Sequence, residues 1–181
     1  ARVCPTGAIT EQFRAIGSVK SGHAGAVRFV EGVLNVGEAM SPPLIRSVKK
    51  LQTPDAWNIL DAPPGTSCPV VTTVKDAGYV LLVTEPTPFG LNDLKLAVEL
   101  MRSLGRSFGV VSNRAGGGND SVKRYCQGDL IPLLGEIPDD RAVAEAYSRG
   151  KMLLHEVPSF RAAMEGLADR LVRIVSERGA L

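Results

Sequence analysis

Apolar and polar positions along the chain follow two patterns, one typical of strands and one typical of helices. Short runs that are apolar throughout, or that alternate with polar residues, predict strands, and the later runs are each followed by apolar residues spaced three and four apart. Strands that alternate with helices form βα units and a mostly parallel sheet. The expected strands cover residues 26–34, 56–62, 79–84, 108–112 and 133–137.

Helix boundaries are predicted from residues that satisfy the free backbone groups at helix ends. Ser41 is expected to cap a helix that begins with Pro42 and Pro43, because proline needs no amide partner in a first turn. A second helix is expected over 91–104, with Gly105 at its C-terminal end.

Three more helices are expected toward the C-terminus. One lies around 121–126, one runs from a cap at Asp139 or Asp140 to Gly150, and the last begins at Ser159 as its cap. The core-facing stripe of the last helix comprises Phe160, Met164, Leu167, Leu171 and Ile174.

Local patterns also predict the environment of several other segments. The run 79–84 is apolar throughout, as in a central strand that is buried on both faces. Trp57 begins a predicted strand and is expected in the core, while Cys68 is expected to be partly buried. The first 26 residues have no clear period, and Gly17–Gly25 is expected to form a turn-rich linker.

Composition indicates one globular domain. Of the 181 residues, 44% are hydrophobic and 22% charged, which excludes a disordered chain. No apolar run approaches the roughly 20 residues needed to cross a bilayer, so no membrane span is expected. The net charge of +2 is too small to indicate nucleic acid as a partner. Three widely spaced cysteines do not indicate a disulfide framework, and a cytoplasmic location is expected.

Asp61 stands at the end of a predicted strand, before Pro63-Pro64-Gly65, which cannot lie inside a helix or sheet. One carboxylate at this point can hold a Mg²⁺-bound water, because Mg²⁺ keeps several waters and takes few protein ligands. Gly65 lets its backbone N–H approach a terminal phosphate. The same spacing is equally compatible with an aspartate that caps a loop.

Two later strand ends also carry polar residues. Asn113 can recognise a purine edge because its amide both donates and accepts hydrogen bonds, and Arg114 can stack on a base or close an ion pair. Pro138 and Asp139 follow the next strand, where their backbone can flank a base. Taken singly, each pair is also compatible with an ordinary polar strand end. Ligands of parallel sheets bind at this carboxyl edge.

Together these motifs resemble the MinD/ParA/Mrp-type ATPases, which are P-loop NTPases with a deviant Walker A motif. The resemblance extends over roughly residues 26–178 and implies a three-layer α/β/α fold, incomplete at the N-terminus. The matching segments are Asp61–Gly65, Ser112-Asn113-Arg114 and Ile137-Pro138-Asp139 with Ala146 and Gly150, and also Val83–Thr87 with Leu91 and Asp93.

The resemblance also implies roles for single residues. Asp61 would lie beside the Mg²⁺-bound water, and Gly65 would sense the γ-phosphate of ATP. The adenine would be lined by Asn113, Arg114, Pro138 and Asp139. The family works as homodimers that enclose the nucleotide, with the segment around Asp93 near the interface.

Cys4-Pro5 resembles the end of a bacterial ferredoxin motif, in which proline follows the last cysteine. One subgroup of the family carries such a ferredoxin domain with [4Fe–4S] clusters as an insert. Its members are often named CobQ/CobB/MinD/ParA nucleotide-binding or cobyrinic acid a,c-diamide synthase-like. The resemblance implies that residues 1–25 are the remnant of this insert and a linker, and that 26–181 are the C-terminal part of the nucleotide-binding domain. Cys4 would bind a cluster only together with upstream cysteines.

The implied function is an ATPase associated with iron–sulfur clusters, active in electron transfer or in cluster or metallocofactor handling. A redox or metallocofactor protein is the expected partner. The sequence departs from the family because it has no G-x-x-x-x-G-K-[ST] loop: Gly17–Gly22 has the glycine spacing, but His23-Ala24 follow it. This chain alone is therefore expected to lack ATPase activity, as a truncated piece of the parent protein would. The alternative is an interaction module that retains the fold without binding nucleotide.

Overall fold

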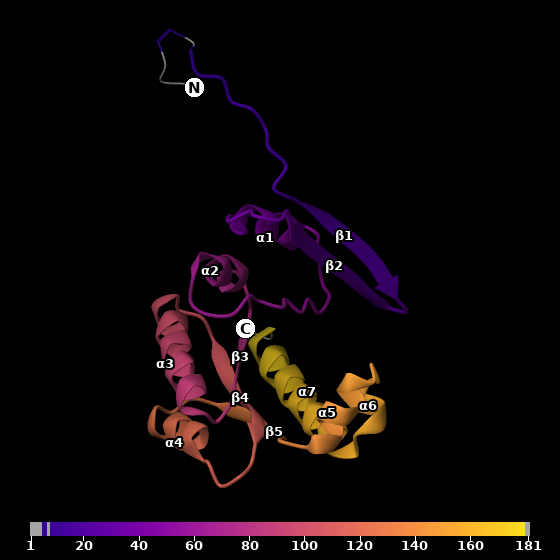
Figure 1. Cartoon of the computed structure of the whole chain (residues 1–181). Helices are drawn as coiled ribbons and strands as arrows, with labels where there is room; N and C mark the ends of the chain where they lie inside the picture. The colour runs from indigo at the N-terminus through magenta and orange to yellow at the C-terminus, as the bar shows by residue number, and fades with distance from the viewer. Residues whose placement is uncertain (1–4, 7, 180–181) are drawn as a thin grey trace. The chain divides into compact units, whose positions relative to one another are not determined.

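The computed structural model describes residues 5–6 and 8–179 (Figure 1). The chain divides into two compact units. The hairpin unit comprises residues 1–63 and 67–73, and the sheet unit comprises residues 64–66 and 74–181.

A β-hairpin is the main element of the hairpin unit. Strand β1 (Gly17–Ala24) pairs antiparallel with β2 (Val27–Leu34), in a register that runs from Gly17 opposite Leu34 to Ala24 opposite Val27. The strand expected over 26–34 is therefore confirmed, whereas the linker expected over Gly17–Gly25 is wrong. Strand β1 has little β-forming sequence of its own, and its backbone is ordered by pairing with β2.

Two helices accompany the hairpin. Helix α1 (Pro42–Lys49) begins after Ser41, as predicted, although the Ser41 side chain makes no capping hydrogen bond. Its last residue, Lys49, donates hydrogen bonds from Nζ to the carbonyl oxygens of Thr72 (3.0 Å) and Thr73 (2.8 Å). Those carbonyls lie in helix α2 (Cys68–Val74), so an ammonium group satisfies free acceptors near the C-terminal end of α2.

The strand predicted over 56–62 is absent, and this prediction is wrong. Trp57 is 61% exposed and Ile59 93% exposed, so the expectation that Trp57 lies in the core is also wrong. A strand needs a neighbour to satisfy its backbone amides and carbonyls, and no strand of the described residues pairs with this segment. The apolar pattern alone is therefore not sufficient to form a strand here.

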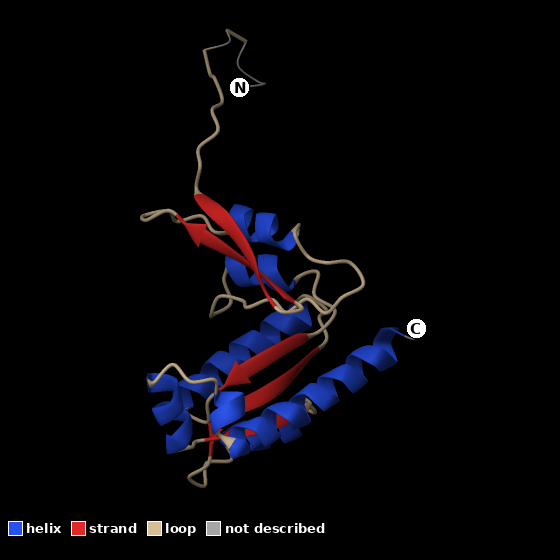
Figure 2. Cartoon of the chain, turned by 90° about the vertical axis from the view of Figure 1, so that its right-hand side faces the viewer, coloured by secondary structure: helices blue, strands red, loops and turns tan. Residues whose placement is uncertain are grey.

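The sheet unit contains three parallel strands in the order β3-β4-β5. Figure 2 shows strands of this sheet in red, with helices in blue beside them. They are β3 (Val80–Thr84), β4 (Phe108–Ala115) and β5 (Leu133–Pro138). Helices α3 (Pro88–Ser103) and α4 (Ser121–Gly128) pack on one face of the sheet, and helix α7 (Pro158–Gly179) packs on the other. The expected α/β/α layering is thus confirmed.

Side chains on the two faces of β4 are buried in two separate hydrophobic cores. Val110 is fully buried against Leu94 and Val98 of α3 and against Val122 of α4. Val111 points to the other face, because successive strand residues alternate, and belongs to a second core. The second core contains Leu134 and Leu167, with Met164, Leu171 and Ile174 packed against it. These four helical residues belong to the predicted stripe of the last helix.

Strand β3 is not the central strand that its apolar run predicts. It lies at the edge of the sheet formed by the described residues, and Val83 is 61% exposed. The central position belongs to β4, whose residues Val110, Val111 and Ser112 are at most 2% exposed. Apolar composition therefore predicted a strand correctly but not its position in the sheet.

Asp140 connects the last helices. Its carboxylate accepts hydrogen bonds from the Ala142 amide (2.8 Å), at the start of helix α5 (Arg141–Ser148), and from the Ser159 hydroxyl (2.8 Å). These two bonds hold the pKa of Asp140 below its ordinary value, and the bond from the Ala142 amide has the larger effect. Helix α7 already begins at Pro158, after the short α6 (Leu153–Glu156), so Ser159 is not its cap. The cap of α5 was predicted as either Asp139 or Asp140, and Asp140 takes this role.

Candidate functional site

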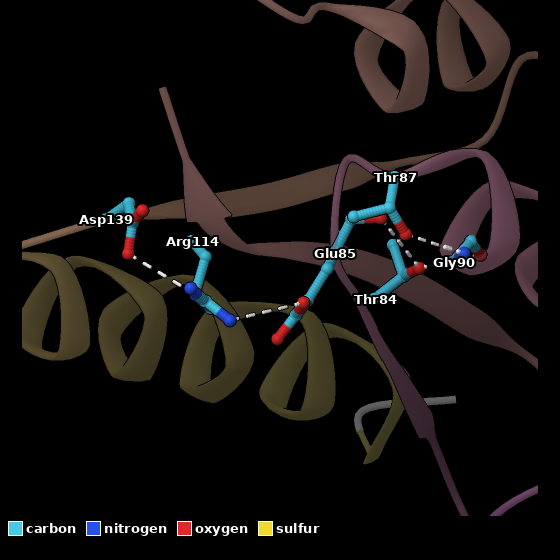
Figure 3. A network of polar contacts seen from close by, with 6 residues as sticks. All are labelled: Thr84, Glu85, Thr87, Gly90, Arg114 and Asp139. Atoms are coloured by element: carbon cyan, nitrogen blue, oxygen red, sulfur yellow. Dashed lines mark hydrogen bonds and ion pairs between the residues drawn. The ribbon is translucent and has the colours of Figure 1, made fainter. Parts of the chain in front are cut away.

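The carboxyl ends of β3, β4 and β5 bring polar residues together at one edge of the sheet. Because the strands are parallel and hydrogen-bonded in register, the loops that follow them emerge side by side. Figure 3 shows the resulting network of polar contacts. The residues that it joins are Thr84, Glu85, Thr87, Gly90, Arg114 and Asp139.

The loop after β3 is fixed to the start of α3 by two threonines. The Thr84 hydroxyl donates to the carbonyl oxygen of Gly90 (2.8 Å), and the Thr87 hydroxyl oxygen accepts from the Gly90 amide (3.0 Å), which caps the helix. A Cβ at Gly90 would lie 2.3 Å from the Glu85 carbonyl oxygen, so only glycine fits. This cap starts α3 three residues before the predicted start at residue 91.

Arg114 joins the loops after β3 and β5. Its Nε lies 3.3 Å from Oδ1 of Asp139, and its Nη1 lies 3.7 Å from Oε2 of Glu85 (Figure 3). Of the two roles considered for Arg114 from the sequence, the structure contains the ion pair. Strand β4 extends to Ala115, three residues beyond the predicted end at 112, and therefore carries Asn113 and Arg114 itself.

Asn119 makes a second connection between loops. Its amide Nδ2 donates to the carbonyl oxygen of Pro86, and its Oδ1 accepts from the amide of Ser121 (3.1 Å) at the start of α4. The Asp139 amide also donates to the carbonyl oxygen of Ala115 (3.0 Å), which links the ends of β4 and β5. Sequence reasoning assigned no role to Thr87 or Asn119. Each follows a strand and precedes a helix, where threonine and asparagine often cap helices, and this signal was available.

Two neighbouring pockets open at this edge of the sheet. The first, of about 380 Å³, is lined by Val83, Thr84, Glu85, Thr87, Gly90, Asp93 and Asn113. The second, of about 240 Å³, is lined by Glu85, Pro86, Thr87, Arg114, Gly116, Asn119 and Asp139. The Asn113 amide has no hydrogen-bond partner among the residues that the structure describes. It is therefore free to donate and accept hydrogen bonds in the first pocket.

Asn113, Arg114, Pro138 and Asp139, which the sequence predicted together, do lie at this edge of the sheet. Asp61 lies in the hairpin unit, in an exposed segment, and lines neither pocket. Gly65 is exposed and has a positive φ of 88°, a conformation that favours glycine. Apart from its chain neighbours, no atom of the described residues lies within 4 Å of the position that a Cβ would take at Gly65.

The cysteines do not converge in the described part of the chain. Cys4 lies outside the described residues. Cys68 is exposed, contrary to the expectation of partial burial, whereas Cys126 is buried in the core beside α3. Burial is the main cause that raises the pKa of the Cys126 thiol, and the nearby Asp129 carboxylate raises it further. Over residues 5–6 and 8–179 no three His, Cys, Asp or Glu side chains gather as metal ligands.

No helix of the described residues combines the length and the apolar character needed to cross a bilayer.

Several curated proteins are similar in sequence. An uncharacterized protein of Methanocaldococcus jannaschii is 32% identical over 149 residues, which cover 81% of this chain and 52% of the relative. An iron–sulfur cluster carrier protein of Pyrococcus horikoshii is 28% identical over 162 residues, covering 75% and 53%. A cytosolic Fe–S cluster assembly factor of Xenopus laevis is 27% identical over 138 residues, covering 62% and 50%. The chain thus spans about half the length of these relatives, and no protein-family model matches it.

Solved structures of MinD proteins share the fold. The cell division ATPase MinD of Pyrococcus furiosus matches with a TM-score of 0.56 and 25% identity, over 74% of this chain and 57% of that one. MinD of Pyrococcus horikoshii in complex with Mg-ADP matches with a TM-score of 0.54 and 24% identity, over 72% and 54%. The chain therefore has the α/β fold of MinD-like P-loop NTPases, and its sequence relatives include carriers and assembly factors of iron–sulfur clusters.

Proposed function

We propose that this chain belongs to an ATP-binding ATPase that acts in iron–sulfur cluster handling, in electron transfer or in metallocofactor assembly. The observation that carries the proposal is the free amide of Asn113 in a pocket at the carboxyl edge of a parallel sheet. This edge is where ligands of open α/β sheets bind. The likeness to MinD ATPases and to iron–sulfur carriers supports the choice of ATP and of clusters.

The adenine base is proposed to contact the ends of β4 and β5. The Asn113 amide can donate to a ring nitrogen and accept from the exocyclic amino group, a pattern that distinguishes adenine from guanine. Pro138 and Asp139 would flank the base with their backbone and are held near β4 by the 3.0 Å hydrogen bond from Asp139 to Ala115. Arg114 would line this side of the site and hold Asp139 there by their ion pair.

Asp61 and Gly65 are proposed to act on Mg²⁺ and on the terminal phosphate, because the Asp61–Gly65 motif resembles that of MinD-type ATPases. Mg²⁺ fits this segment, because it needs one or two carboxylates and keeps its waters, and no larger cluster of ligands is present among the described residues. When bound with ATP, Mg²⁺ would neutralise charge on the phosphate oxygens. Asp61 would hold a water of the ion, and the backbone amide of Gly65, which carries no side chain, would donate to the terminal phosphate.

The whole protein is proposed to dimerise and to carry iron–sulfur clusters. Phe89 (85% exposed), Asp93 and Leu96 (48% exposed) fall on one side of α3 at helical spacing and form an exposed surface suited to a second copy. Residues 1–25 would comprise the remnant of the ferredoxin-like insert and the connection to the next domain, in which β1 pairs with β2. Cys4 would ligate a [4Fe–4S] cluster only together with upstream cysteines. Residues 26–181 would form the C-terminal part of the nucleotide-binding domain.

The adenine site is tested by titrating ATP into the full-length protein by calorimetry. Asn113→Ala is expected to weaken ATP binding about ten-fold, because the variant loses two hydrogen bonds to the base. Gln127→Ala removes an exposed amide at the end of α4, outside both pockets, and should leave the affinity unchanged. A full-length protein that binds no ATP would contradict the proposal.

A second candidate is an interaction module that retains this fold without nucleotide. The given residues contain no G-x-x-x-x-G-K-[ST] loop, which is compatible with this candidate and equally with a longer ATPase that carries the loop elsewhere. In that case neither ATP nor ADP would shift the thermal midpoint of the full-length protein at millimolar concentration. A nucleotide-dependent rise in the midpoint would favour the ATPase.

A further inference from the structure

Arg114 is the residue through which the ends of all three strands are connected. It belongs to β4, and its guanidinium contacts Glu85, which follows β3, and Asp139, which follows β5 (Figure 3). Glu85, Arg114 and Asp139 all line the 240 Å³ pocket. The width of that pocket therefore depends on contacts that Arg114 makes.

The backbone of Arg114 indicates that this position is imposed by its surroundings. Its φ is +53°, a left-handed conformation that costs energy for a residue with a Cβ. On either side of it, Asn113 lines the first pocket and the Ala115 carbonyl accepts from the Asp139 amide. The left-handed conformation lets consecutive residues of β4 serve different pockets.

Arg114 is also already engaged on both sides of its guanidinium. Nε is directed to Asp139 and Nη1 to Glu85, whereas the neighbouring Asn113 amide has no partner in the described residues. Direct recognition of a base therefore falls to Asn113. Arg114 is arranged to hold carboxylates instead, as a planar fork with several donors does well.

We propose that Arg114 is a positioning residue for the base: it holds the loops after β3 and β5 at a fixed separation and thereby shapes the base-binding end of the site. This inference rests on the proposed function, since it assigns a role within the nucleotide site. Without the two ion pairs, the Asp139 loop loses its connection to the β3 loop. The base then binds a wall that it must first order. The phosphates are assigned to Asp61 and Gly65, with which Arg114 forms no ion pair, and their binding should be unaffected.

The test compares Arg114→Ala with Arg102→Ala in the full-length protein. Arg102 also forms an exposed ion pair, 3.2 Å from Asp129, but at the far end of α3 and outside both pockets. The KM for ATP is expected to rise about ten-fold in Arg114→Ala with kcat nearly unchanged, since two exposed pairs contribute modestly to ground-state binding. Inhibition by inorganic tripolyphosphate, which has no base, should keep its Ki. Arg114→Lys should recover part of the loss, because an ammonium can replace only one arm of the fork.

Hydrogen exchange of the nucleotide-free protein gives a readout that does not depend on ATP. The backbone amides of Glu85, Thr87, Asp139 and Asp140 should exchange faster in Arg114→Ala than in Arg102→Ala. Unchanged exchange and an unchanged KM would overturn the inference, as would equal losses for ATP and tripolyphosphate. A wild-type protein that binds no ATP would instead overturn the proposed function, and faster exchange in Arg114→Ala would still support the connection between the loops.

Discussion

The sheet unit and the hairpin unit use similar apolar sequence with different results. In the sheet unit, apolar runs form strands that helices cover on both faces, and Val98 and Val110 are fully buried. In the hairpin unit, Phe29 is 58% exposed and Ile59 93% exposed. The difference teaches that an apolar pattern becomes a strand where neighbouring backbone pairs with it, as β1 does with β2 although Phe29 is exposed, and that it becomes a core only where helices cover it.

The largest expected effect separates the two units directly. Leu94→Ala removes a side chain that is 3% exposed between α3 and β4, and should lower the free energy of unfolding by about 3 kcal/mol. Ile59→Ala should change it by less than about 0.5 kcal/mol, because its side chain is already in water. Urea unfolding measures both. Similar losses of unfolding free energy in the two variants would mean that Ile59 is buried in solution, and would contradict the difference between the two units.

Substitutions of two glycines test the same difference between the two units, with an expected change in stability of intermediate size. A Cβ on Gly109, in β4, would lie 2.5 Å from Oη of Tyr79 and 2.7 Å from Cδ1 of Leu134, so Gly109→Ala should destabilise by about 1–3 kcal/mol through overpacking. Gly22, in β1, has nothing within 4 Å of that position. Gly22→Ala should therefore leave stability equal or raise it by up to about 1 kcal/mol. Thermal and urea unfolding of both variants would reveal whether the hairpin is as open as described.

The smallest expected effect depends on pH. The amide of Ala142 and the hydroxyl of Ser159 lower the pKa of Asp140, so its carboxylate stabilises the fold above its unfolded-state pKa, and this contribution is lost as pH falls through the folded-state value. Asp140→Asn should lower the thermal midpoint at pH 7 and weaken its dependence on acid between about pH 5 and 2. Asp120→Asn is the control, since Asp120 precedes α4 without a side-chain capping bond. Equal responses of the two variants would count against this role of Asp140.

Much of the sheet unit could be predicted from the sequence because its signals are local. Continuous apolar runs gave β3, β4 and β5, and the stripe of α7 followed from helical spacing. Strand β1 was missed because its order comes from pairing with β2 and not from its own residues. The segment 56–62 was predicted as a strand because sequence does not reveal whether a pairing neighbour is present.

The candidate site could be predicted only in part, because some of its residues are recognisable locally whereas their contacts come from distant parts of the chain. Asn113, Arg114 and Asp139 stand out as polar residues at strand ends, and they lie together. The position of Asn119 before a helix was a usable signal, but its contact with the backbone of Pro86, 33 residues earlier, could not be predicted. The choice of Arg114 between base stacking and ion pairing likewise depends on two carboxylates from other loops.

The end of β4 also limits how the length of this chain can vary. Asn113 and Arg114 line different pockets although they are consecutive, so a deletion or insertion of one residue within β4 would exchange their surroundings and disrupt both at once. The loop that follows, residues 116–118, is exposed and has open space around each position. Length changes among homologous proteins, or in libraries of variants, should therefore be found after Ala115 and not before it.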